Sequence, residues 1–431
     1  MESETLPIAP VPPSSALSAF ADCDISSETG RLRRVLVHRP GAELERLVPG
    51  NHRDLLFDEI PWLPAAQREH DAFTDSLRRE GVTVVPLLQA FEEALTAPSA
   101  RRDVLRAALR RAKLGRDLTE IVRSWLDGLS ASELVTSLVS GVTVDELADG
   151  ARTAAEQTLA LHGRPGDRFL LKPAPNTMFV RDSSNWIGSR CLPAAMATPA
   201  RGSEGDLLRA VLSAAGAPLV PAKPDTAPAE RGAHLDGGRI EGGDVLVPGP
   251  GCVIVGVGER TTPAAAEALA RSLLTNGLAQ HVFAVLLPIE RSTMHLDTVA
   301  TMADHDTLLV SALHQHACTW VRLTAGRGGT IRAHTIDHPM QVLARALGLP
   351  ALRVIDTGAD SFSARREQWS DAANVLAVSP GTVIAYDRNT TTNANLDRVG
   401  VRVITVPSSE LARGRGGPHC LSCPLLRDPI R

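Results

Sequence analysis

Short apolar runs alternate with helical patterns along most of the chain after residue 166, and this alternation limits the possible fold more than any other feature. Short apolar runs bounded by turn residues predict strands, whereas apolar residues at three- and four-residue spacing predict helices. The expected strands are 169–171, 178–180, 244–247, 252–257, 282–287, 307–310, 352–355, 374–378, 382–386 and 401–405. The expected helices are 203–215, 261–276, 339–348 and 390–398, the second marked by Thr262 and Pro263 as cap and first turn.

The order strand, short turn, strand, helix, strand recurs within this region. Two expected strand pairs, 244–247 with 252–257 and 374–378 with 382–386, each enclose a Pro-Gly turn between apolar runs. One such unit cannot cover its own apolar face, so repeated units must pack together. The sequence therefore predicts an α/β fold built from repeated units.

The first 161 residues have a different texture. Residues 1–24 lack periodicity and are rich in proline, so we expect a disordered tail there. A strand over 31–38, a helix over 64–80 and a strand over 82–85 are expected next. Residues 91–161 are dominated by Ala, Leu, Arg and Glu, and glycines divide them into pieces of helix length. This pattern predicts an inserted bundle of helices, which leaves 25–90 and 162–431 as the α/β catalytic part.

Composition narrows the class of partner and the compartment. The 45 basic and 49 acidic residues give a net charge of −4, aromatic residues make up 3%, and no long basic run occurs, so no nucleic-acid partner is expected. The strongly apolar stretch 282–289 is too short to span a bilayer, and the first twenty residues lack the basic start of a secretory signal. Six cysteines are too few for a disulfide scaffold. We therefore expect a cytoplasmic protein with free thiols and no membrane partner.

Acidic residues and a histidine interrupt the apolar pattern at three places. Asp182 follows an expected strand, where site residues of α/β folds are common, although taken alone it is better explained as a turn residue that bonds its own backbone. Glu241 and Asp244 flank two glycines, which suits either a close backbone approach to a ligand or a tight turn. His295 and Asp297 share one face if their segment is extended, and a carboxylate raises the proton affinity of an imidazole. A hydrogen-bonded core histidine is the alternative.

The last cluster is the glycine- and arginine-rich stretch that ends in Cys420, Leu421, Ser422 and Cys423. Glycine allows the backbone to approach a substrate closely, and a nearby arginine favours the thiolate that acts as a nucleophile. The Cys-x-x-Cys spacing also permits a redox pair, half of a zinc site with His419, or a coincidence in a loop flanked by Pro418 and Pro424. Neither the zinc nor the dithiol pattern is complete in this sequence.

Taken in order, these clusters resemble the arginine deiminase family of the guanidino-group modifying superfamily. The matching stretches are Phe179-Val180-Arg181-Asp182, Glu241-Gly242-Gly243-Asp244, Gly258-Glu259-Arg260-Thr261-Thr262, His295-Leu296-Asp297-Thr298, Gly416-Gly417-Pro418-His419-Cys420, and parts of 30–40 and 61–71. The resemblance covers about residues 25–431. It implies a five-bladed, pseudo-symmetric α/β propeller of ββαβ units with an inserted helical bundle. It also implies hydrolysis of L-arginine to L-citrulline and ammonia, without a metal or organic cofactor, by a homo-oligomer.

The resemblance assigns roles residue by residue. Cys420 would attack the guanidinium carbon to form an amidino-thioether, and His295 would act as acid and then base. Carboxylates can hold a guanidinium in a bidentate fashion. The implied catalytic set is Cys420, His295, Asp182, Asp297 and Glu241, and the implied substrate-binding set is Asn176, Phe179, Arg201, Asp244, Arg260 and Arg415.

Three other functions use the same residues. An amidinotransferase would need the same thiol, histidine and acids, with an amine in place of water in the second step. A catalytically silent arginine-binding protein would not need the complete chemical set. A thiol–disulfide protein would need Cys423 as much as Cys420, and oxidation of this pair would inactivate a deiminase.

Overall fold

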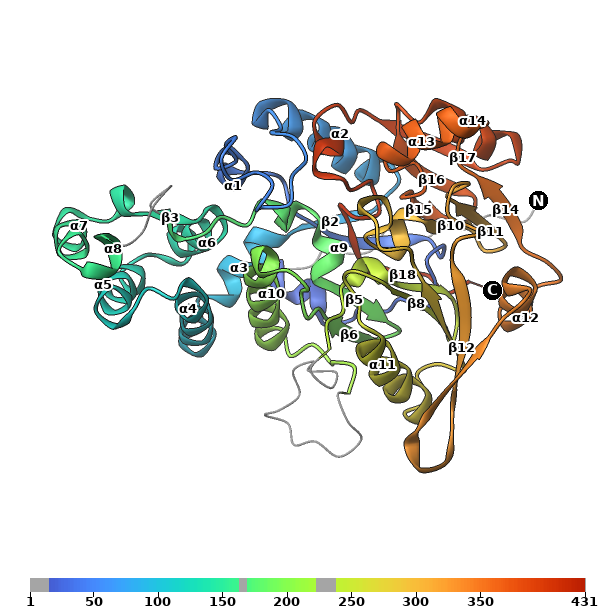
Figure 1. Ribbon diagram of the computed structural model, residues 1–431, viewed down its shortest axis with the longest axis horizontal. Coiled ribbons are helices and arrows are strands. Elements are labelled where there is room, and N and C mark those ends of the chain that lie inside the picture. Colours follow the sequence, from blue (N-terminus) through green and yellow to red (C-terminus); the bar gives the residue numbers. More distant parts are fainter. Residues whose placement is uncertain (1–14, 163–168, 222–237, 431) are drawn as a thin grey trace, which may run out of the picture.

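The computed structural model describes residues 15–162, 169–221 and 238–430. Within them the chain forms a mixed α/β fold of several small sheets, with a helical segment projecting to one side (Figure 1). No helix in these three ranges is long and apolar enough to cross a membrane.

Four of the sheets contain an antiparallel strand pair followed, after a helix, by a strand parallel to the second one. The first of these sheets has β7 (Val245–Gly249), β8 (Cys252–Val257) and β9 (His281–Leu286) with helix α11 (Pro263–Thr275), and the second has β10 (Ala300–Asp304), β11 (Thr307–Val310) and β14 (Arg353–Asp356) with helix α12 (Pro339–Ala346). The third has β15 (Leu376–Ser379), β16 (Thr382–Tyr386) and β17 (Arg402–Val406) with helix α14 (Thr390–Arg398). The last has β18 (Cys423–Arg427), β1 (Leu32–Val37) and β2 (Thr83–Pro86) with helix α2 (Leu63–Arg79). The last sheet joins the two ends of the described chain. The expected repeat is therefore present as the same order of strand pairing in each of these four sheets.

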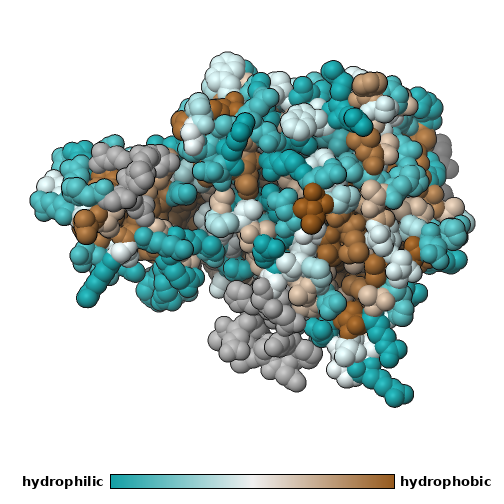
Figure 2. Space-filling view, in the orientation of Figure 1, coloured by the Kyte–Doolittle hydropathy of each residue, from teal (hydrophilic) through white to brown (hydrophobic). Residues whose placement is uncertain are grey.

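A fifth strand pair has the same beginning. β5 (Ser184–Ile187) pairs antiparallel with β6 (Arg190–Pro193), α10 (Gly202–Ala214) follows, and Leu219 then forms a parallel bridge with Cys191. The β7–β8–β9 sheet is extended by β12 (Thr319–Ala325) and β13 (Ile331–Thr335) into five strands. Figure 2 shows polar side chains over most of one face, with apolar side chains gathered in the region of α11 and β12.

Local sequence explains the best-predicted elements. All six residues of β8 are buried, as expected for an uninterrupted apolar run between two neighbouring strands. The Thr262 hydroxyl accepts a hydrogen bond from the amide of Ala265 and Pro263 occupies the first turn, so α11 starts where the sequence predicts.

The helical segment consists of α3 (Leu87–Ala94), α4 (Pro98–Ala112), α5 (Arg116–Asp127), α6 (Ala131–Ser140), α7 (Asp149–Glu156) and α8 (Leu159–His162). A short antiparallel pair, β3 (Val142–Thr143) with β4 (Phe169–Leu171), returns the chain to the sheets. Apolar side chains from α4 to α7 share one buried cluster with Trp186 and Cys423 of the sheets. The helices thus pack on the α/β part through a common core.

The expectation of a disordered tail is wrong for residues 15–24. Ala19 and Phe20 are buried in the same cluster as α3, and the Glu93 carboxylate accepts hydrogen bonds from the amides of Ala16 and Leu17 at 3.0 and 2.7 Å. These contacts hold a segment that has no periodicity of its own. Residues 1–14 lie outside the described residues.

A further expectation is wrong near the site. Residues 178–180 form no strand, because Pro175–Met178 is a 3-10 helix, η3, and Val180–Ser183 a single helical turn, α9. The carbonyls of Asn176 and Phe179 accept hydrogen bonds from Arg201 instead of from a neighbouring strand. The loop expected between Pro418 and Pro424 ends at Ser422, since Cys423 begins β18 and pairs with Leu36 of β1.

Candidate active site

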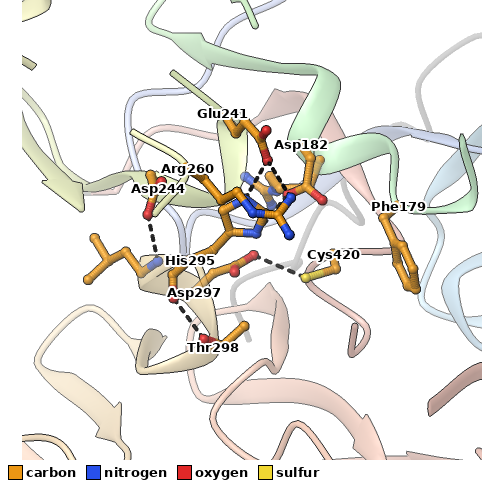
Figure 3. A network of polar contacts seen from close by, with 12 residues as sticks. Phe179, Asp182, Glu241, Asp244, Arg260, His295, Asp297, Thr298 and Cys420 are labelled. Atoms are coloured by element: carbon orange, nitrogen blue, oxygen red, sulfur yellow. Dashed lines mark hydrogen bonds and ion pairs between the residues drawn. The ribbon is translucent and has the colours of Figure 1, made fainter. Parts of the chain in front are cut away.

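The predicted catalytic side chains converge from four separate parts of the chain (Figure 3). Asp182 lies in α9, and Glu241 precedes the 3-10 turn η6 (Gly242–Asp244). His295 lies directly before η8 (Leu296–Thr298), and Asp297 lies within it. Cys420 lies between η10 (Leu411–Gly414) and β18. All five are buried. The segment 295–297 is not extended throughout, and η8 turns His295 and Asp297 toward different partners.

Cys420 is the thiol at the centre of this group. Its Sγ lies 3.4 Å from Oδ2 of Asp297 and 3.2 Å from Nδ2 of Asn374. Burial, reinforced by the negative charges of Asp297 and Asp182, raises the pKa of the Cys420 thiol well above its usual range. A cation placed among these groups would favour the thiolate.

His295 lies between two carboxylates, neither of which is Asp297. Its Nε2 lies 2.7 Å from Oε2 of Glu241, and its Nδ1 lies 3.4 Å from Oδ1 of Asp182. Burial opposes protonation, but the charge of Asp182 and the bond to Glu241 outweigh it and raise the pKa of His295 to about 9. The imidazole is therefore protonated at neutral pH and can act as a general acid.

Glu241 directly precedes η6 and Asp244 is its last residue, and the two carboxylates have different environments. Burial would raise the pKa of Glu241, but the hydrogen bond and charge of His295 lower it to about 2, so this carboxylate is ionised. Burial raises the pKa of Asp244 to about 7, and its Oδ1 accepts the amide of Leu296 at 2.9 Å. Asp244 therefore supports the segment that carries His295.

The glycine pair between these acids meets a steric need. A Cβ on Gly243 would lie 2.6 Å from Oδ1 of Asp182 and 2.9 Å from the His295 ring. No side chain fits there, so the glycine lets η6 pass directly behind the catalytic groups. The expected close approach at 241–244 is therefore toward the protein's own site residues.

Arg201 lies behind Asp182. Its guanidinium contacts Oδ2 of Asp182, donates to the Glu204 carboxylate from Nε and Nη2, and donates from Nη2 to the carbonyls of Asn176 and Phe179. Every nitrogen of this guanidinium is already engaged. The geometry indicates a residue that positions Asp182, which differs from the substrate-binding role expected for Arg201.

Asp297 connects the thiol to a buried chain of charged groups. Its Oδ2 lies 2.8 Å from Nδ1 of His419, and Nε2 of His419 lies 3.2 Å from Oε2 of Glu28. Glu28 also lies 3.7 Å from Nη1 of Arg181. Burial would raise the pKa of Glu28, but Arg181 and His419 lower it to about 2. The chain holds Asp297 beside the sulfur.

Three other predicted binding residues lie close to this centre. Arg260 is buried, forms ion pairs with Glu241 at 3.6 Å and Glu259 at 3.4 Å, and has no hydrogen-bond partner for Nε among the described residues. Asn176 donates from Nδ2 to the carbonyl of Leu55 at 2.7 Å. The ring of Phe179 packs against the backbone of Gly414 and Gly416, at both of which a Cβ would meet it.

Arg415 faces a cavity of about 250 Å³. Its guanidinium lies 3.9 Å from the centre of the Trp369 ring, and within the described chain its Nε and Nη1 have no hydrogen-bond partner. The other residues that line this cavity are Asp58, Glu59, Arg388, Ser409, Ala412 and Arg413.

The described residues hold a compact set of metal-ligand side chains at one place, outside the group around the thiol. Among the described residues, one group of His, Cys, Asp or Glu side chains is compact enough to share an ion, namely Asp304, His305 and Asp306 in the turn between β10 and β11. His305 is exposed, and Arg353 pairs with both aspartates, which makes this a solvated charge cluster.

Sequence reasoning missed three residues at the centre. Asn374 bonds to Cys420, and Glu28 and Glu204 hold the partners of Asp297 and Asp182. Asn374 lies between α13 (Ser361–Trp369) and β15, without a recognisable motif around it. Only the three-dimensional arrangement reveals these contacts.

Fold and site together place the chain among the guanidino-group modifying enzymes. Residues 53–427 match the family model described as arginine deiminase, and the chain belongs to that family. It is 44% identical to the arginine deiminase of Rhodococcus opacus (strain B4), over 96% of this chain and 99% of the relative, and 45% identical to that of Rhodococcus jostii (strain RHA1), over the same shares. Its fold is also similar to SxtG, an amidinotransferase from Microseira wollei in the saxitoxin biosynthetic pathway, with a TM-score of 0.51 at 15% identity over 95% of this chain and 98% of that one.

Proposed function

We propose that this chain hydrolyses L-arginine to L-citrulline and ammonia, with Cys420 as the nucleophile. One observation carries the mechanism. Oδ1 of Asp182 and Oδ1 of Asp297 are both buried near the thiol, and neither accepts a hydrogen bond within the described part of the chain. Unsatisfied buried carboxylate oxygens are costly, and the N–H groups of a guanidinium would satisfy both.

The substrate would also activate the thiol. The carboxylates that raise the pKa of Cys420 are the same groups that would bind the guanidinium, so binding offsets their negative charge. The thiolate then attacks the guanidinium carbon. Protonated His295 gives its proton to the departing ammonia, which leaves with the electron pair of the broken C–N bond, and an amidino-thioether remains.

The second half returns the enzyme to its starting state. Neutral His295 removes a proton from water, and the resulting hydroxide adds to the same carbon. Collapse of this adduct breaks the C–S bond, passes the hydroxyl proton to solvent, releases citrulline and restores the thiolate. Glu241 orients His295 and stabilises its charged form through the 2.7 Å contact.

Product analysis tests this function. Purified protein incubated with L-arginine under reducing conditions should form citrulline and ammonia in equal amounts. Formation of an amidino derivative of an added primary amine would support the amidinotransferase instead. Tight binding of arginine without turnover would support the silent binding protein.

We assign the substrate carboxylate to Arg260. Replacing Arg260 by Gln should raise KM for L-arginine on the order of 10- to 100-fold and lower kcat less, because a charge-assisted hydrogen bond to the part of the substrate far from the reacting carbon is lost. Steady-state kinetics with L-arginine and with agmatine, which lacks the carboxylate, measure this effect. The discrimination between the two substrates should shrink in the variant.

An exposed arginine provides the control for this prediction. Arg322→Gln on β12 removes one positive charge from the solvent-facing surface and should leave both kinetic constants unchanged. If Arg260→Gln keeps the full preference for L-arginine over agmatine, Arg260 does not bind the carboxylate.

The Glu28 chain has a pH-dependent stability effect. The pKa of Glu28 lies at about 2 in the folded protein, below the ordinary value of 4.5, so its contribution to stability is complete above pH 4.5 and is lost as the pH falls through 2. Glu28→Gln should therefore lower the free energy of unfolding at pH 7 by roughly 3 kcal/mol. Denaturant titration measures this loss, which should shrink between pH 4.5 and the acid limit, whereas Glu45→Gln at an exposed site should change little. A loss that stays constant with pH would contradict an ionised Glu28.

The described sheets support a finer description of the fold. We place the four complete ββαβ sheets and the β5–β6 pair as five blades of a pseudo-symmetric propeller, with the helical segment 91–161 as an insertion into the α/β part. Homo-oligomeric assembly, a cytoplasmic location and the absence of a nucleic-acid partner stay predictions. Sedimentation of the purified protein and cell fractionation test the first two, and a filter-binding assay with DNA and RNA tests the third.

A further inference from the structure

Asn374 makes a shorter polar contact with the thiol than Asp297 does, at 3.2 Å against 3.4 Å. It is fully buried, and its Nδ2 donates to Sγ of Cys420 at 3.2 Å and to the carbonyl of Asp297 at 2.9 Å. Its Oδ1 accepts the backbone N–H of Cys420 at 3.0 Å. One side chain thus contacts both the backbone and the sulfur of the same cysteine.

The orientation of this amide follows from its partners. The backbone N–H of Cys420 can only donate, so the oxygen of Asn374 must face it. The carbonyl of Asp297 can only accept, so the nitrogen must face that side. One N–H group of Asn374 therefore faces the Asp297 carbonyl and the other is directed at the sulfur. The opposite placement of the amide would leave two buried groups without partners.

The surrounding packing keeps the amide in place. A Cβ on Gly417 would lie 2.6 Å from the carbonyl oxygen of Asn374 and 2.9 Å from its Oδ1, so glycine is needed where the two segments touch. The backbone carbonyl of Asn374 accepts the amide of His419 at 3.3 Å. The segment that carries Asn374 and the segment that carries Cys420 are thus held as one unit.

The sulfur needs a donor in both halves of the reaction. The other polar side-chain contact of Sγ in the described chain is the carboxylate of Asp297, which accepts from a thiol and repels a thiolate. A thiolate is present before attack on the guanidinium carbon and again when the C–S bond breaks. A hydrogen bond from a neutral amide stabilises the charged form in both cases.

We propose that Asn374 is a catalytic residue that donates a hydrogen bond from Nδ2 to the sulfur of Cys420, stabilising the thiolate as attacking group and as leaving group. This assignment rests on the proposed function, in which Cys420 is the nucleophile. It adds a donor that acts on the sulfur itself, apart from the carboxylates that hold the substrate.

Two variants test the donor. Asn374→Asp keeps the shape and the acceptor for the Cys420 amide but removes the N–H groups, and Asn374→Ala removes the contact without adding charge. The pH dependence of Cys420 alkylation by iodoacetamide, followed by peptide mass spectrometry without arginine, should shift upward by at least about one pH unit in both. The value of kcat should fall on the order of 100-fold.

A neighbouring asparagine provides the matched control. Asn389 is buried and donates a hydrogen bond to the carbonyl of Ser370, which lies in the loop between α13 and β15 that also carries Asn374. Asn389→Ala therefore loosens that loop without touching the sulfur. Its alkylation profile should match the unmodified protein. An unchanged profile in folded Asn374→Ala, or an equal shift in Asn389→Ala, would overturn the proposal.

A measurement on the unmodified protein covers the case in which the variants do not fold. After selective ¹⁵N labelling of asparagine, one side-chain amide signal should titrate with the alkylation midpoint of Cys420 and stop titrating in Cys420→Ala. If no amide signal behaves in this way, Asn374 does not sense the charge of the sulfur. Alkylation reports on the thiol alone, so a failure of this proposal is distinguishable from a failure of arginine hydrolysis, which product analysis detects.

Discussion

Alanine in place of Cys420 is expected to lower citrulline formation on the order of 10⁴-fold or more, because no other thiol or hydroxyl of the described residues is placed to form the covalent intermediate. The variant keeps Asp182, Asp297 and Arg260, so it should still bind L-arginine. Steady-state assays measure the loss of turnover, and calorimetric titration with L-arginine measures the retained binding. Substantial turnover in this variant would exclude the thiol mechanism.

The second thiol of the Cys-x-x-Cys stretch is the matched control. Sγ of Cys423 lies 3.6 Å from the carbonyl of Ser184 and 3.7 Å from its hydroxyl, in the apolar cluster beneath β5 and β18. Cys423→Ala should therefore retain most of the activity. If Cys423→Ala were inactive and Cys420→Ala active, the assignment of Cys420 as the nucleophile would be wrong. Inactivation by oxidation of the two thiols stays a prediction.

The elements that the sequence predicted well are those whose signals are local. The capped start of α11 and the apolar run of β8 depend on neighbours within a few residues. β5 and β18 were missed because their pairing partners decide them. β5 contains Ser184 and Asn185 in a buried strand, and β18 includes Pro424 and pairs with β1 from the other end of the chain.

The candidate site divides in the same way. The motifs identified the acids, the histidine and the thiol, because each interrupts an apolar pattern with reactive groups. The sequence spacing did not predict which of these side chains contact one another. In the structure η8 turns His295 toward Glu241 and Asp182, whereas Asp297 contacts His419 and Cys420. Residues that act through geometry alone, such as Asn374, carry no sequence signal that distinguishes them from ordinary buried asparagines.

The second large effect is expected at His295. Replacing it by Gln keeps a side chain of similar length and polarity but removes the group that protonates ammonia and then activates water. Loss of a general acid and base costs roughly 10²- to 10⁴-fold in kcat. Turnover assays measure this loss, and exposed His334→Gln on β13 should show none.

The pH profile separates a catalytic histidine from a structural one. Because its pKa in the folded protein is about 9, His295 is protonated below that pH, and kcat/KM of the unmodified enzyme should fall above it as the general acid is lost. The raised pKa also stabilises the fold fully below the ordinary value of 6.5, and this contribution disappears as the pH rises through 9. His295→Gln should therefore be less stable than the unmodified protein near pH 6, the difference should shrink toward pH 9, and the alkaline fall in kcat/KM should be absent. If the variant keeps that alkaline fall, another group donates the proton to ammonia.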